Sequence, residues 1–262
     1  MGVLGLLLGA FIAEGFQIVD HGMELILASV TVFTFIVGGN SLNDYTDREV
    51  DKKAHPERPI PSGRIAPKNA LVLSGSAFAI SFACSLPLDW ISIAIVVSAI
   101  VVMILYEVGV KRTGLPGNLS IAWLTAALFL LGGAVVGSPE KTMIFAAMAF
   151  LAILGREIVK DIEDMDADFD RNTLPKRIGA KASGVIGSSS FLLAVVLSVE
   201  PYLNGYLDLG YLAVVLVADA IFIYCSIVHF QNPSRGQRLA KYGMLVALLA
   251  FLIGKLQVVI TG

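Results

Sequence analysis

The sequence has few charged residues, few cysteines and almost no net charge. Only 15% of its 262 residues are charged, whereas a soluble domain carries about 25%. The formal net charge of −2 excludes a strongly basic nucleic-acid-binding domain. Cys84 and Cys225 lie in apolar runs and form neither a disulfide framework nor a metal-binding spacing. Because 56% of the residues are apolar, disorder and an ordinary cytosolic enzyme are excluded as well.

Long apolar runs dominate the sequence, and the mean hydropathy is +0.79. A helix needs about 20 apolar residues to span a bilayer. The length fits one domain, so we expect an all-α membrane protein with nine transmembrane helices in a single transmembrane domain over residues 1–262. The nine expected spans are 3–18, 24–42, 69–87, 90–107, 118–137, 141–160, 181–199, 209–230 and 238–259.

Lysine and arginine residues are distributed unequally among the predicted loops. With nine spans, all of the 19 basic residues except Lys141 and Lys255 fall in or beside the loops after spans two, four, six and eight. Cytoplasmic loops carry an excess of Lys and Arg. The sequence therefore predicts a multi-pass protein of the cell membrane with these loops in the cytoplasm, the amino terminus inside and the carboxyl terminus outside.

The loop after the second predicted span begins with a stripe of acidic and amide side chains. If the preceding helix continues, each residue turns by about 100°, and the stripe then covers an arc of roughly 100°. Lys52 points elsewhere on the same geometry. The residues of this first stripe are Asn43, Asp44, Asp47 and Asp51.

The loop after the sixth predicted span carries a second stripe. On the same helical geometry Asp161, Asp164 and Asp168 fall within about 60°. Glu163 and Asp166 project to the opposite side. One stripe therefore occurs in each half of the chain, which predicts two pseudo-repeated halves over residues 1–137 and 138–262.

The two stripes predict a site for a hard divalent cation. Like charges four residues apart destabilise a helix by a few tenths of a kcal/mol per pair, so a cation is needed to offset the repulsion. Mg²⁺ takes oxygen ligands and is usually bound by one or two carboxylates together with substrate phosphates. Histidine and cysteine, which zinc favours, are missing from both stripes. All seven stripe residues are therefore predicted magnesium ligands.

Several motifs together resemble those of the UbiA superfamily of intramembrane prenyltransferases. The two stripes, read as Asn-Asp-x-x-Asp-x-x-x-Asp and Asp-x-x-Asp-x-x-x-Asp, match its two aspartate-rich motifs. The match covers nearly the whole chain, and it implies nine helices around a central cavity. Further agreement comes from Arg58–Arg64, from Tyr106 with Lys111–Gly114 and Asn118, from Arg156–Asp161, and from Thr173–Pro175 with Gly179.

The resemblance implies Mg²⁺-dependent transfer of a prenyl group from an allylic diphosphate donor to a lipid-like hydroxyl acceptor. The only other expected partners are membrane lipids, with no nucleic acid and no obligatory protein partner. Asp47, Asp51, Asp164, Asp168 and Tyr106 become the candidate catalytic residues. The candidate diphosphate contacts are Asn43, Arg58, Lys111, Asn118, Arg156 and Lys160.

Within the superfamily, the compact length and the second motif look most like archaeal members that add a geranylgeranyl group to geranylgeranylglyceryl phosphate. The alternatives are an aromatic prenyltransferase of the 4-hydroxybenzoate type, acting in quinone biosynthesis, and a transporter with an acidic ion site. The acids gather in two blocks at one interface, which favours an enzyme over a transporter.

Individual residues also have simpler interpretations. Arg58 is equally well explained as a positive-inside determinant, and Tyr106 as an interfacial belt residue. A helix cap is the alternative role for Asn118. Glu107 follows Tyr106 at a position where the superfamily commonly has a small hydroxyl residue, and its role stays open.

Overall fold

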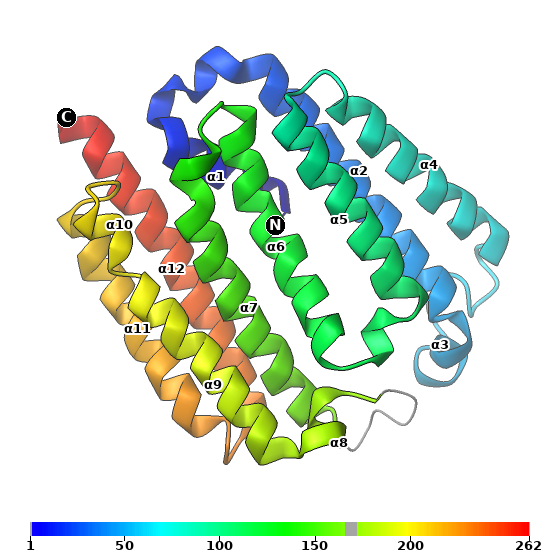
Figure 1. Cartoon of the computed structure of the whole chain (residues 1–262). Coiled ribbons are helices and arrows are strands. Elements are labelled where there is room, and N and C mark those ends of the chain that lie inside the picture. The colour runs from blue at the N-terminus through cyan, green and yellow to red at the C-terminus, as the bar shows by residue number, and fades with distance from the viewer. Residues whose placement is uncertain (1, 166–171, 262) are drawn as a thin grey trace.

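The computed structural model describes residues 2–165 and 172–261, and every regular element in this part of the chain is helical (Figure 1). Three short α-helices and three 3-10 turns connect the long helices: α3 (Arg48–Ala54), α8 (Leu174–Ile178), α10 (Glu200–Leu203), η1 (Gly15–His21), η2 (Val110–Arg112) and η3 (Pro139–Thr142). The long helices are α1 (Gly2–Glu14), α2 (Gly22–Thr46), α4 (Pro67–Ser85), α5 (Trp90–Val108), α6 (Leu115–Val135), α7 (Met143–Glu163), α9 (Ala180–Leu197), α11 (Leu209–Val228) and α12 (Pro233–Thr261).

The expected all-α membrane architecture is present, whereas the count of nine spans is not confirmed. Seven stretches of the described residues are long and apolar enough to cross a membrane, and the first of them joins α1, η1 and α2. Helix α1 has only 13 residues, and the predicted first span 3–18 is wrong at its end because Gly15, at φ +60°, follows the last residue of α1. Helix α4 is not among these seven stretches, because its four serines, Lys68 and Asn69 lower its mean hydropathy.

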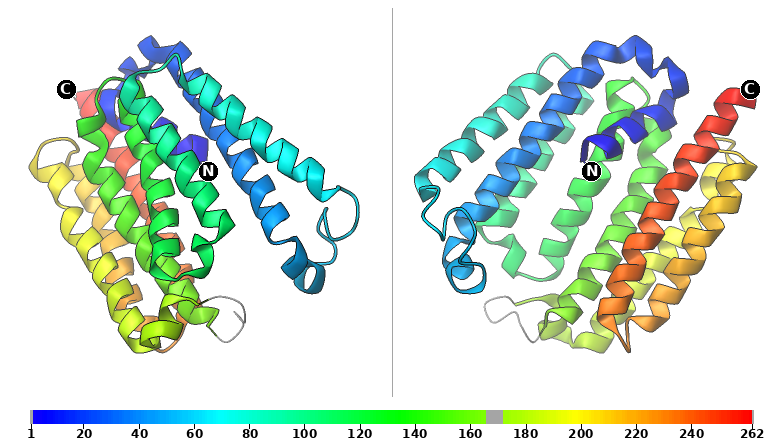
Figure 2. Two further views of the ribbon diagram at one scale, coloured as in Figure 1. Left: turned by 45° about the vertical axis from the view of Figure 1, so that its right-hand side comes forward. Right: turned by 180° about the vertical axis from the view of Figure 1, so that it is seen from behind.

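The long helices pack side by side along the length of the molecule (Figures 1 and 2). Helix α2 packs on α4, α6 lies between α5 and α7, and α9, α11 and α12 form the other flank. Close approach of α1 to α6 depends on small residues, which is typical of helix pairs in membranes. A Cβ atom on Gly9 would lie 2.8 Å from the carbonyl oxygen of Phe129, and one on Gly132 would collide with the carbonyl oxygen of Leu6.

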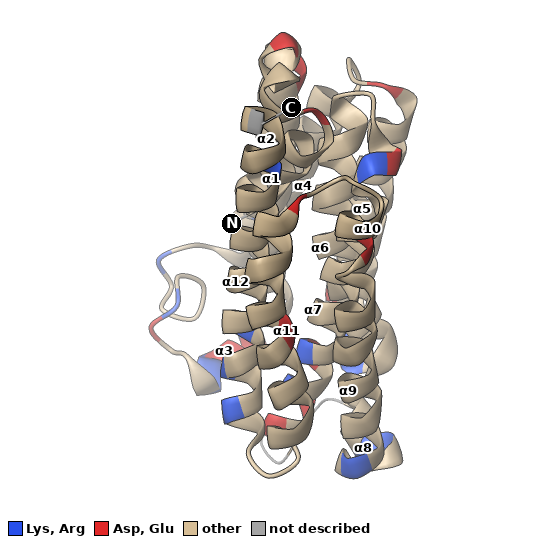
Figure 3. Cartoon of the chain, turned by 90° about the vertical axis from the view of Figure 1, so that its left-hand side faces the viewer, with Lys and Arg blue, Asp and Glu red and all other residues tan. Residues whose placement is uncertain are grey.

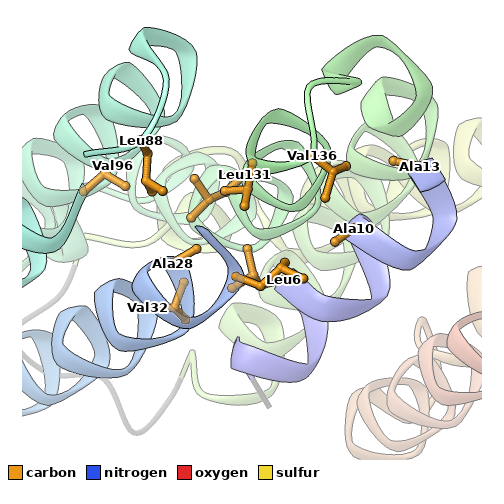
Figure 4. Packing of buried hydrophobic residues seen from close by; sticks show 11 residues of the cluster. Leu6, Ala10, Ala13, Ala28, Val32, Leu88, Val96, Leu131 and Val136 are labelled. Atoms are coloured by element: carbon orange, nitrogen blue, oxygen red, sulfur yellow. The ribbon is translucent and has the colours of Figure 1, made fainter. Parts of the chain in front are cut away.

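An apolar core joins α1, α2, α5 and α6. Leu6, Ala28, Val32 and Leu131 belong to this cluster (Figure 4). Beside it lies an apolar pocket, lined by residues of α2, α4, α5 and α6 that include Val32 and Ala127. The pocket therefore lies between the long helices, away from the end of the molecule that contains α3.

Charged side chains concentrate at one end of the molecule. Figure 3 shows most of the Lys and Arg residues around α3 and α8, at the end opposite η1. Both acidic stripes begin at this end, because α2 leads into α3 and α7 ends near α8. The fold therefore brings the described residues of both predicted motifs to the same end of the molecule. The division into two repeated halves stays a prediction.

Candidate active site

The first motif follows a helix that bends once. Helix α2 ends at Thr46, Asp47 adopts φ −91° and ψ 0°, and α3 resumes at the next residue. The N–H of Asp47 donates to the carbonyl of Asn43 at 2.9 Å, and the N–H of Asp51 donates to the carbonyl of Asp47 at 2.8 Å. The predicted unbroken helix is wrong at Asp47, but the hydrogen-bond spacing continues through the bend.

A buried ion network ties this motif to the end of α5. The ammonium of Lys111 lies 2.6 Å from Oδ1 of Asp47 and 2.7 Å from Oε2 of Glu107, and it donates to Oγ1 of Thr46 at 2.9 Å. The side chains of Lys111 and Glu107 are only 2% and 4% exposed. Breaking a buried pair by removing one partner is strongly destabilising, so these contacts fix the position of Asp47.

Asn43 lies between two carboxylates, and this fixes the orientation of its amide. Its Nδ2 donates to Oδ2 of Asp47 at 3.0 Å and to the carboxylate of Glu107 at 3.2 Å. Ionised carboxylates only accept hydrogen bonds, so the nitrogen must face them. The amide oxygen of Asn43 is therefore the atom left for a cation.

Asp51 at the end of the first motif is paired with Arg58. The guanidinium Nη1 lies 2.7 Å from Oδ2 of Asp51, whose side chain is 7% exposed, and this hydrogen bond raises the pKa of Arg58. Arg58 itself is partly exposed. Arg58 therefore has a defined partner, which an arginine that serves only as a positive-inside determinant does not need.

The second motif begins inside a helix and continues beyond it. Helix α7 ends at Glu163, and Asp164 adopts φ −87° and ψ 0° with its N–H donating to the carbonyl of Lys160 at 2.9 Å. The expectation that a helix continues through the motif is therefore wrong from Asp164 onward in the described residues. Asp166 and Asp168 lie outside the described residues.

Upstream of this point, α7 presents a polar face. Asp161 accepts a hydrogen bond from Nδ2 of Asn118 at 3.0 Å. Arg156 is ion-paired with the buried Glu157, and Lys160 lies 3.9 Å from the same carboxylate. Lys160, with a side chain 38% exposed, is the more accessible of these two cations.

One continuous segment, residues 107–118, contacts both motifs. Its first part supplies Glu107 and Lys111 to the first motif, and its last residue supplies Asn118 to the second. Asn118 lies in the first turn of α6 and does not cap it, because the N-cap position belongs to Gly114. Tyr106, half-buried, precedes this segment on α5. The segment therefore joins two acidic motifs that are more than a hundred residues apart in sequence.

A turn at Gly114 shapes this segment. Gly114 has φ +77° and ψ −121°, and a Cβ there would lie 2.7 Å from the backbone nitrogen of Leu174. The N–H of Asn172 also donates to the carbonyl of Arg112 at 3.0 Å. The loop after η2 therefore packs directly on the chain that follows the second motif.

Replacing Gly114 with Ala is expected to lower the thermal stability and the activity together. The backbone strain alone costs about 1–3 kcal/mol, and the added methyl group must displace the backbone at Leu174. Gly109→Ala is the matched control, since a Cβ at Gly109 meets no atom within 4 Å and its φ is −174°. The measurement is the thermal unfolding midpoint of each of the two purified variants. Equal midpoints would contradict this account of the turn.

The donor set suits a hard cation. Asp164 follows the last residue of α7, where the helix dipole is negative and a carboxylate is unfavourable without a cation. Asp47 lies between the end of α2 and the start of α3, so the two helix dipoles oppose each other at its carboxylate. All the motif side chains offer oxygen, which Mg²⁺ prefers. Within the ranges that the structure describes, no three or more His, Cys, Asp and Glu side chains are grouped closely enough to hold a metal ion by themselves.

Sequence reasoning left the role of Glu107 open and missed Thr46. Both bond directly to Lys111. The spacing of Glu107 and Lys111, four residues apart in sequence, is a signal for an ion pair, although Glu107 lies in α5 and Lys111 in η2. No signal of this kind exists for Thr46.

Comparison with known proteins agrees with this geometry. The model of the UbiA prenyltransferase family matches residues 3–252, and the chain therefore belongs to that family. It is a multi-pass membrane protein and a prenyltransferase, as the motifs predict.

Similar relatives share one description. The chain is 38% identical to the digeranylgeranylglyceryl phosphate synthase of Methanosarcina mazei, over 92% of this chain and 84% of the relative. It is 37% identical to the protein of the same name from Methanothermobacter thermautotrophicus, over 97% of this chain and 91% of the relative. Neither name favours a transporter or an aromatic prenyltransferase.

Solved structures confirm the fold. A structure described as concerning digeranylgeranylglyceryl phosphate synthase in membranes has a TM-score of 0.89 and 30% identity, covering 98% of this chain and 93% of that one. A UbiA homologue from Archaeoglobus fulgidus, bound to DMAPP and Mg²⁺, has a TM-score of 0.67 and covers 96% of this chain and 94% of its own. At 16% identity the second likeness shows the fold alone.

Proposed function

We propose that this chain transfers a geranylgeranyl group from geranylgeranyl diphosphate to the hydroxyl of geranylgeranylglyceryl phosphate, forming the ether-lipid precursor of archaeal membranes. The observation that carries the proposal is the joining of both aspartate motifs by residues 107–118 at one end of an apolar bundle. The names of relatives that match more than nine-tenths of the chain support the choice of donor and acceptor.

The proposed cation site lies between the two helix ends. Asp47 and Asp164 are its central ligands, joined by the amide oxygen of Asn43. Bound Mg²⁺ supplies Lewis-acid stabilisation of the leaving diphosphate. The remaining proposed ligands are Asp44, Asp51, Asp161 and Asp168.

The basic side chains divide by exposure into two groups. The side chains of Arg58 and Lys160, 41% and 38% exposed, are accessible to an incoming diphosphate. Lys111 is buried against Asp47, so it fixes the position of the Asp47 carboxylate and contacts diphosphate only after rearrangement. Arg156 and Asn118, partnered with Glu157 and Asp161, and the amide of Asn43 complete the proposed diphosphate contacts.

The chemistry needs charge stabilisation at the diphosphate and the exclusion of water near the prenyl carbon. The bond between C1 of the donor and the diphosphate oxygen breaks, and the electron pair leaves with diphosphate. A bond then forms between C1 and the acceptor hydroxyl oxygen, which releases its proton. Preorganised cations contribute most in a water-poor site, and we assign Tyr106, the residue before Glu107, to stabilising the allylic cation.

The acceptor assay tests this proposal directly. Purified protein is given labelled geranylgeranyl diphosphate with either geranylgeranylglyceryl phosphate or 4-hydroxybenzoate. The expected product is the diether phosphate, formed only with the first acceptor, and a reaction without acceptor is the control. Transfer to the aromatic ring alone would assign the chain to quinone biosynthesis instead.

We also propose that the charged end faces the cytoplasm of a cell-membrane protein, since basic residues gather there. Single cysteines at Glu57, Arg177 and Asn204, all exposed, test this after Cys84 and Cys225 have been replaced. An impermeant maleimide added to intact cells is expected to label position 204 and to spare positions 57 and 177. Labelling of 57 and 177 from opposite sides would contradict a shared site.

A further inference from the structure

Glu107 forms several hydrogen bonds with the first motif, although the resemblance assigns it no role. It is 5% exposed, and its carboxylate accepts hydrogen bonds from Asn43, Thr46 and Lys111. Asn43 and Thr46 belong to α2, whereas Glu107 and Lys111 lie at the end of α5 and in η2. A buried carboxylate with three donors is therefore placed next to a predicted metal ligand, on a different helix.

Lys111 is saturated by these contacts. An ammonium group has three N–H donors, and here they meet Asp47, Glu107 and Thr46. Asp47 is held on both oxygens, by Lys111 on Oδ1 and by Asn43 on Oδ2. A divalent cation bound through Oδ1 of Asp47 would repel the ammonium of Lys111, so binding there weakens the contact between Asp47 and Lys111.

That step would leave a buried ammonium without a counter-charge if Asp47 were its only partner. A buried charge whose partner is removed is strongly unfavourable. Glu107 prevents this, because its Oε2 stays 2.7 Å from the ammonium when Asp47 moves away. Asp47, Glu107 and Lys111 together carry one net negative charge, so one carboxylate is available while the other remains paired.

We infer that Glu107 is a positioning residue that keeps Lys111 paired when Asp47 turns to the divalent cation. The inference rests on the proposed function in one respect, since it takes Asp47 as a ligand of that cation. Removing the Glu107 charge leaves a neutral pair of Asp47 and Lys111, in which the lysine competes fully with the cation for Asp47. Cation binding then weakens although no ligand has been lost.

Cation binding by the full-length chain in detergent micelles tests the inference. Mn²⁺ is titrated in the presence of inorganic pyrophosphate, and bound Mn²⁺ is followed by electron paramagnetic resonance. Glu107→Gln is expected to raise the half-saturating Mn²⁺ concentration by about tenfold, which corresponds to about 1.4 kcal/mol. An unchanged concentration would overturn the inference.

Glu49→Gln is the matched control for charge. Glu49 lies two residues after Asp47, its side chain is 66% exposed, and it pairs with Lys52 at 2.9 Å. Exposed pairs contribute little because solvent screens them, so its half-saturating concentration is expected to stay within about twofold of the unaltered protein. A rise equal to that of Glu107→Gln would overturn the inference, because net charge alone would then explain it.

Glu107→Asp separates direct contact from charge and covers the case in which the Gln variant fails to fold. It keeps the negative charge and shortens the side chain by one methylene, which removes the bond to Lys111. The half-saturating Mn²⁺ concentration is expected to rise here too, and a value equal to the unaltered protein would overturn the inference. Normal Mn²⁺ binding without transfer to geranylgeranylglyceryl phosphate would instead defeat only the proposed function.

Discussion

Asp164→Ala is expected to reduce prenyl transfer by about a hundredfold or more, whereas Glu163→Ala is expected to retain most of the activity. The two residues are adjacent acids, so composition and local net charge do not distinguish them. Glu163 is the exposed last residue of α7, and Asp164 is the next residue. This end of α7 lies at the same end of the molecule as α3 (Figure 1). The loss of a cation ligand removes stabilisation of the leaving diphosphate.

The measurement is the initial rate with labelled geranylgeranyl diphosphate, made on variants with matched unfolding midpoints. A surface acid such as Glu163 changes stability by no more than about 0.5 kcal/mol when replaced. Asp47→Ala is expected to match Asp164→Ala in rate and still fold, because Glu107 continues to pair with Lys111. Equal losses at Asp164 and Glu163 would show that the segment acts only as a general acidic surface.

Removal of divalent cations is expected to abolish turnover, and Mg²⁺ or Mn²⁺ is expected to restore it. Asp47 and Asp164 are carboxylates of the first and second motifs, and they repel a diphosphate unless a cation lies between the like charges. Lys111 neutralises only part of this charge, because it is shared with Glu107.

The initial rate is measured after dialysis against EDTA and again after each metal is added back. Zn²⁺ is the informative comparison, since it favours nitrogen and sulfur ligands and the motif side chains supply oxygen. Full activity in excess EDTA would remove the reason for both aspartate motifs. A preference for Zn²⁺ would contradict the all-oxygen ligand set.

Much of the fold was predictable because membrane insertion depends on local composition. Apolar runs identified the membrane class, and the placement of basic residues identified the charged end, which the structure shows around α3 and α8. Helix ends were less predictable. Gly15 interrupts the first run with φ +60°, and the four serines of α4 lower its hydropathy, so run length alone miscounts the stretches that are apolar enough to span.

The candidate site divides in the same way. Spacing along the chain identified the acids of both motifs, because residues three and four apart share a helix face. It placed them on unbroken helices, and the structure bends the chain at Asp47 and ends α7 before Asp164. A helical period describes only residues that remain in the helix, so it could not predict where each helix stops.

The sequence by itself therefore determined the membrane class, the face on which the acids gather and the residue types offered to a cation. Only the tertiary structure decided which side chain holds which acid. Lys111 and Asp47 are 64 residues apart, and Asn118 and Asp161 are 43 apart. These contacts depend on how α5 and α6 pack between α2 and α7, and that packing is set by small residues and apolar surfaces far from the site, which no motif records.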